Sequence, residues 1–150
     1  SLFHHYRNKE ALVADVLENS LNGFRTRVES MHNQPAQRQL DAFLDIYQRR
    51  IGAGSRLCSV SGVTGDWDHL GEEPRHWALE LLNEQTAWLK RIAELAGFAH
   101  SAAEAEAWAE QIMVRIQGAM LLSRVQSSPL PLERTIALMR IEWARATSAS

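Results

Sequence analysis

The sequence contains one cysteine, Cys58, among its 150 residues, and no apolar run long enough to cross a bilayer. A single cysteine excludes an internal disulfide framework and is compatible with a reducing compartment. A membrane-spanning helix needs ~18 consecutive apolar residues, and a secretory signal needs a basic segment before an apolar one; the sequence has neither. We therefore expect a cytoplasmic protein with no membrane segment.

The sequence also has little net charge, with a formal value of −2 at pH 7. A chain of this balance is not a general basic coat for nucleic acid. Its first nine residues differ from the rest, because Arg7 and Lys9 occur there before the first acid, Glu10. A basic end on a mildly acidic body predicts one tip that faces DNA.

Motifs of catalysis and of metal binding are missing. The serines near Cys58 form no G-x-S-x-G turn, and no glycine-rich phosphate loop is present. His4 and His5 are adjacent, so on a helix they would point ~100° apart, which does not suit a pair of metal ligands. The segment from Asp66 begins like a calcium loop, but Trp77 stands where a bidentate Glu is required. We expect no metal, no cofactor and no enzymatic activity.

No segment of strand length alternates apolar and polar residues; apolar residues recur instead at steps of three and four, which is typical of amphipathic helices. Asn8 is a plausible N-cap, Gly97 a C-terminal stop, and Ser101 with Glu104 a capping box. Pro74 suits a first helical position. The sequence therefore predicts an all-α bundle of about six helices, near residues 9–31, 40–51, 57–66, 74–96, 102–126 and 132–143.

The first twelve residues, Ser1-Leu2-Phe3-His4-His5-Tyr6-Arg7-Asn8-Lys9-Glu10-Ala11-Leu12, resemble the close of the helix-turn-helix in TetR/AcrR-type transcriptional regulators. The stretch 117–124 is similar to that family's E-G-A-x-x-x-A-R segment, with Gln in place of Glu. The resemblance implies that residues 1–8 are a remnant of a helix-turn-helix domain. Residues 9–150 would form an effector-binding and dimerisation domain. Since the chain begins within the motif, we expect that it does not bind DNA specifically by itself.

The same resemblance implies the DNA contacts. Ser1 and Lys9 would lie on phosphates, and Phe3, His4 and His5 would lie along the groove at the end of the recognition helix. Phe3 replaces the more usual Tyr and so lacks a hydroxyl that could bond a phosphate.

A mixed face on the helix after Pro74 predicts an effector pocket. Trp77, Leu81, Gln85 and Trp88 share that face, with one polar group among apolar side chains, which suits a largely apolar pocket. Plain core packing is the alternative for each residue. Cys58 is either a buried structural residue or, beside Arg56, a reactive thiolate. The candidate pocket residues are Phe24, Tyr47, Cys58, Trp77, Leu81, Gln85, Trp88, Met113 and Gln117.

The last two helices carry apolar residues on more than one face, which predicts that they bury surface against a second subunit. The candidate dimer-interface residues are Gly118, Leu121, Leu122, Ile136, Met139 and Trp143. The sequence thus favours a homodimeric regulator, expected to be a repressor, that binds double-stranded DNA and is switched by a small, largely apolar effector. The alternative is a helical ligand-binding or dimerisation module with no role in DNA binding.

Overall fold

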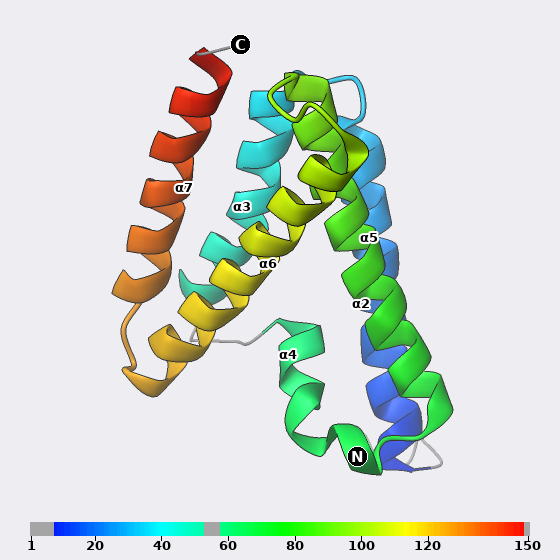
Figure 1. Ribbon diagram of the computed structural model, residues 1–150. Helices are drawn as coiled ribbons and strands as arrows, with labels where there is room; N and C mark the ends of the chain where they lie inside the picture. Colours follow the sequence, from blue (N-terminus) through cyan, green and yellow to red (C-terminus); the bar gives the residue numbers. More distant parts are fainter. Residues whose placement is uncertain (1–7, 53–57, 149–150) are drawn as a thin grey trace.

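Six α-helices, one 3-10 helix and no strand make up the part of the chain that the computed structural model describes, residues 8–52 and 58–148 (Figure 1). The predicted all-α class is therefore confirmed. The helices are α2 (Lys9–Met31), α3 (Ala36–Gly52), α4 (Ser59–Val63), the 3-10 helix η1 (Thr64–His69), α5 (Glu72–Ala96), α6 (Ala102–Val125) and α7 (Leu130–Ser148).

Local capping explains where several helices begin and end. The Asn8 side chain accepts a hydrogen bond of 2.8 Å from the N–H of Ala11 at the start of α2. Ser101 caps α6 by accepting from the N–H of Glu104 at 3.2 Å. The Glu104 carboxylate accepts from the N–H of His100 at 2.7 Å, one residue earlier than a standard capping box predicts. α5 ends at Ala96 and is capped by Gly97, whose φ of 78° is left-handed and so favours glycine.

Two helices begin two residues earlier than the sequence predicted, so that each has a proline inside its first turn. α5 starts at Glu72, which places Pro74 third in the helix, and α7 starts at Leu130, ahead of Pro131. Both prolines are tolerated because the first four N–H groups of a helix have no intrahelical partner. The short helix expected near 57–66 is α4 followed by η1.

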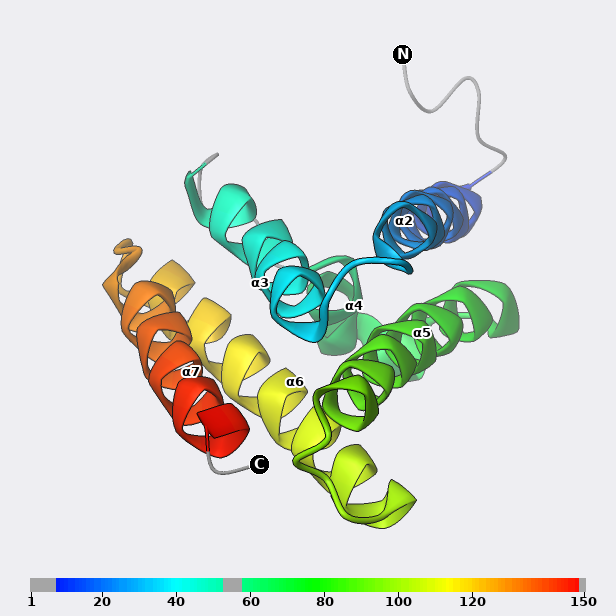
Figure 2. The same ribbon diagram turned by 90° about the horizontal axis from the view of Figure 1, so that it is seen from above.

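The helices form two pairs with α3 between them. α2 lies along α5, and α6 along α7, while α5 also packs against α6 and joins the two pairs (Figures 1 and 2). α3 contacts α5 more than it contacts α2, α6 or α7. An aromatic cluster occupies the space where α2, α3 and α5 meet; it consists of Phe24, Phe43, Tyr47 and Trp88.

None of the helices in the described ranges is both long and apolar enough to cross a membrane.

Candidate ligand-binding site

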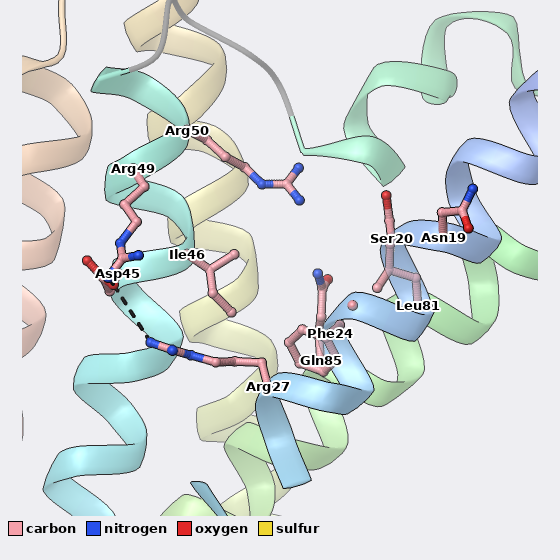
Figure 3. Close-up of a pocket in the computed structure, with 11 residues that line it drawn as sticks. Asn19, Ser20, Phe24, Arg27, Asp45, Ile46, Arg49, Arg50, Leu81 and Gln85 are labelled. Carbon is pink, nitrogen blue, oxygen red and sulfur yellow. Dashed lines mark ion pairs between the residues drawn. The ribbon is translucent and has the colours of Figure 1, made fainter. Parts of the chain in front are cut away.

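A cavity of about 360 Å³ lies between α2, α3 and α5 (Figure 3). Its volume falls within the ~300–1,000 Å³ that small-molecule sites usually occupy. The residues that line it come from all three helices: Asn19, Ser20, Gly23, Phe24, Arg27, Asp45, Ile46, Arg49, Arg50, Leu81 and Gln85.

The inner wall of the cavity is apolar. Phe24 from α2, Ile46 from α3 and Leu81 from α5 contribute to it. The Phe24 ring meets the Trp88 ring edge-on, with centroids 5.6 Å apart, so the wall is backed by the aromatic cluster. An apolar ligand body would therefore contact a surface that core packing already holds in place.

The outer wall carries an excess of positive charge, because three arginines line the cavity with a single acid, Asp45. Asp45 pairs with Arg49 at 2.6 Å and with Arg27 at 3.8 Å. Arg50, which is half-buried, has no ion-pair partner among the described residues, and Figure 3 shows its guanidinium extending from α3 toward Ser20 on α2.

Two buried polar atoms on the lining lack hydrogen-bond partners. Gln85 is 4% exposed, and its Oε1 atom is unpaired; the Nε atom of Arg27 is unpaired as well. Within the described ranges, the third such side-chain atom is the Trp77 Nε1. Leaving a buried polar group unpaired costs about 1–3 kcal/mol, and native proteins have few of them. Their presence on one cavity identifies it as the candidate site.

Tyr47 and Cys58 lie in the core beside the cavity and do not line it. Within the part of the chain that the structure describes, the Tyr47 hydroxyl makes one weak contact, at 4.0 Å to the Met113 sulfur. Burial raises the pKa of Tyr47 well above its usual value, Cys58 raises it further, and Arg50 opposes the shift. The phenol therefore stays neutral throughout the physiological range.

The structure brings three of the predicted pocket residues together on the cavity wall, namely Phe24, Leu81 and Gln85. Met113 lies on a separate open groove between α5 and α6. Gln117 accepts a hydrogen bond from the Ser61 hydroxyl and so joins α6 to α4. The remaining predicted residues are side chains of the core or packed against it: Tyr47, Cys58, Trp77 and Trp88.

The charged lining is what sequence reasoning missed. Charged residues on amphipathic helices usually face water. From the sequence alone, we would therefore expect solvent exposure for the charged residues of the lining, which are Arg27, Asp45, Arg49 and Arg50. One signal was available: Asp45 and Arg49 are spaced i,i+4, and Arg49 with Arg50 ends a helix where cations are favoured. That signal indicates a helix end and says nothing of a ligand.

Of the predicted DNA contacts, Lys9 alone is described; Ser1, Phe3, His4 and His5 lie outside the described residues. Lys9 begins α2, and its ammonium is 3.8 Å from Asp66, with the lysine side chain 80% exposed. An exposed pair of this kind contributes little, so Lys9 can exchange Asp66 for another anion. Beside it, a Cβ added at Gly71 would collide with the Glu10 carboxylate, so the start of α2 lies against the start of α5.

The predicted dimer-interface residues fall into two groups. Gly118, Leu121 and Leu122 are exposed on α6. Ile136, Met139 and Trp143 are buried inside the subunit, where Trp143 packs on Phe98 and Trp108. The apolar surface that α6 and α7 leave exposed is made by Val114, Leu121, Leu122, Val125, Leu130, Leu138 and Ile141.

Comparison with known proteins identifies the fold. No protein-family model matches the chain. No curated protein matches its sequence significantly. Among solved structures, a TetR transcriptional regulator from Legionella pneumophila superposes with a TM-score of 0.81 at 18% identity, covering 94% of this chain and 77% of that one. Escherichia coli NemR in its reduced form gives a TM-score of 0.68 at 22% identity, covering 92% and 76%. The chain therefore has the fold of TetR-type regulators, as its opening residues suggested.

Proposed function

We propose that this chain is the effector-binding and dimerisation region of a DNA-binding transcriptional repressor. The observation that carries the proposal is α2, one unbroken helix that lines the cavity near its middle and begins at Lys9. The TetR-type fold supports it, and the proposal assigns no catalytic step to the chain.

α2 is suited to transmit a displacement from the cavity to the predicted DNA-facing end. At 1.5 Å per residue, Phe24 on the cavity wall lies about 22 Å along the helix from Lys9. α2 packs along α5, whereas it contacts α3 much less, so it can tilt on α5 as the space next to α3 fills. Glu10 against Gly71 marks the contact that such a tilt would alter at the far end.

The proposed switch has two states. Without effector, the dimer holds two DNA-binding heads at the spacing of successive major grooves, about 34–36 Å. The effector enters between α2 and α3, favours a different tilt of α2 and so changes that spacing. A coupling free energy of about 1–3 kcal/mol would suffice to release DNA.

The second subunit is proposed to bind the exposed apolar surface of α6 and α7. Leu121 and Leu122 on α6 and Leu138 on α7 are each about half exposed. Apolar surface on two adjacent helices is favoured at subunit interfaces, and a twofold axis there would make the contact self-complementary.

Fluorescence anisotropy tests the proposal, using the protein as its gene encodes it and DNA from upstream of that gene, over a salt series. We expect tight binding to a two-half-site DNA, much weaker binding to one half-site, and an affinity that falls steeply with salt. Lys9→Ala should weaken binding to all sequences and lower the salt slope by about 1.

Lys90→Ala is the matched control, since Lys90 is the other lysine of the sequence and pairs with Glu106 on α6. It should bind DNA as the unaltered protein does. Weak binding that ignores sequence, equal on one and two half-sites, would contradict the proposal and favour a helical module without a DNA role.

A further inference from the structure

The charged side chains of the cavity indicate the charge of its ligand, which the apolar wall does not. Three arginines and one aspartate line the site, and Asp45 already pairs with two of the arginines. Positive charge therefore remains uncompensated next to an apolar wall. An entirely apolar ligand would bury that wall and leave the charge without a partner.

Arg50 and Arg27 supply the donors for an anion. Arg50 has no ion pair among the described residues and extends across the cavity toward α2 (Figure 3). Arg27 is held at 3.8 Å from Asp45 through its terminal nitrogen, while its Nε is buried and unpaired. A guanidinium presents its N–H groups in a planar fork that matches a carboxylate, so both of these arginines on the lining are suited to bind one.

Helix-end electrostatics explain part of this arrangement but not all of it. Arg49 and Arg50 lie in the last turn of α3, where the helix dipole favours cations. Arg27 lies four residues before α2 ends at Met31, just outside the last turn, where the dipole effect has already weakened, so the dipole accounts less well for its charge at the cavity. Gln85, from a third helix, adds a buried acceptor that has no donor.

We infer, on the basis of the proposed effector site, that the ligand of this cavity is an amphipathic organic acid. Its carboxylate is bound by Arg27 and Arg50, and its apolar body lies on Phe24, Ile46 and Leu81. Gln85 accepts from a hydroxyl or N–H of the ligand where one is present. The acid lies between α2 and α3, which is where a displacement of α2 begins.

A matched series of probes tests the inference by isothermal titration calorimetry on the full protein: decanoate, decanol and decyltrimethylammonium. These probes share an apolar chain and differ in the charge of the head. We expect decanoate to bind at least about tenfold more tightly than decanol, since a hydrogen bond to a charged group contributes about 1.5–3 kcal/mol. Decyltrimethylammonium should bind most weakly.

Arg50→Gln should weaken decanoate binding about tenfold or more and leave decanol binding unchanged. Arg38→Gln is the control, because Arg38 is an exposed arginine at the opposite end of α3 and does not line the cavity. It should change neither affinity. Thermal unfolding of each variant without probe confirms that the fold is retained.

The outcomes separate this inference from the proposed function. The inference of an anionic ligand would be overturned if decanol or decyltrimethylammonium bound as tightly as decanoate, or if no probe bound. It would also be overturned if Arg50→Gln and Arg38→Gln lost equal affinity for decanoate. The DNA anisotropy experiment needs no probe and stands apart from these results. Decanoate that binds as expected but leaves DNA affinity unchanged would support the site and overturn the switch.

Discussion

Two buried glutamines occupy opposite ends of the space between α2, α3 and α5, and their surroundings differ. Gln39, near the α2–α3 turn, accepts a hydrogen bond of 2.9 Å from the Trp88 indole and donates one of 2.8 Å to the Gln34 carbonyl. Gln85 lies at the cavity, with its buried Oε1 unpaired. Both are about 5% exposed.

The difference separates a structural amide from a binding amide. Gln39 joins the turn to the aromatic cluster, and each of its groups has a partner inside the chain. Gln85 keeps its acceptor free at a site that a ligand can fill. A buried polar group is therefore informative about function when its partners are missing, rather than because it is buried.

The largest expected effect is on stability, and it distinguishes Phe43, in the core, from Phe24, on the cavity wall. Phe43→Ala should lower the free energy of unfolding by about 3–5 kcal/mol, because Phe43 is fully buried. Phe24→Ala should cost roughly 1–2 kcal/mol less, since its ring borders an existing cavity. Urea denaturation followed by tryptophan fluorescence measures both values. Equal losses would show that the region around Phe24 is packed as closely as the core.

The two glutamines themselves provide the next test. Gln39→Leu should lower the free energy of unfolding by about 1–3 kcal/mol, because it leaves the Trp88 N–H and the Gln34 carbonyl without their partner. Gln85→Leu should cause no loss, since it removes an acceptor that is already unpaired. Gln111→Leu, on the exposed side of α6, is the control for the change in residue type. A loss in Gln85→Leu as large as in Gln39→Leu would mean that Gln85 is also structural.

The smallest effect concerns Tyr47, a buried residue of α3 next to the cavity-lining Ile46 in the sequence. Because burial raises its pKa in the folded protein, the unfolded chain ionises first, and Tyr47 should reduce stability only as the pH rises above about 10. Tyr47→Phe should remove this alkaline loss and change stability at pH 7 by no more than about 1 kcal/mol. Denaturation curves across the alkaline range, with tyrosinate absorbance, measure both. Since Arg50 opposes the shift, Arg50→Gln should raise the pKa of Tyr47 further; a lowered pKa would contradict the placement of Arg50 beside it.

The sequence predicted the helices well because their signals are local. The caps at Asn8 and Ser101, the left-handed Gly97 and the three-and-four spacing of apolar residues depend on neighbours within one or two turns. The predicted starts of α5 and α7 were each two residues late, because Pro74 and Pro131 lie in first turns, where proline is tolerated at more than one position.

The candidate site was predicted only in its apolar part. Phe24, Leu81 and Gln85 were recognisable because they share helix faces with core residues. Helical periodicity also selected Tyr47 and Trp88, which are completely buried in the core. Periodicity indicates which face of a helix is buried, but it does not indicate where two helices leave a cavity between their buried faces.

The sequence by itself determined the all-α class, the order of its helices and their buried faces, because hydrogen bonds and side-chain spacing within a helix are set by nearby residues. Only the tertiary structure decided that α2, α3 and α5 leave a cavity between them, that Arg27 and Arg49 both pair with Asp45 while Arg50 lines the same cavity, and that Gln85 lacks a partner. These features depend on crossing angles and on which side chains meet from helices far apart in the sequence, and no local pattern encodes that geometry.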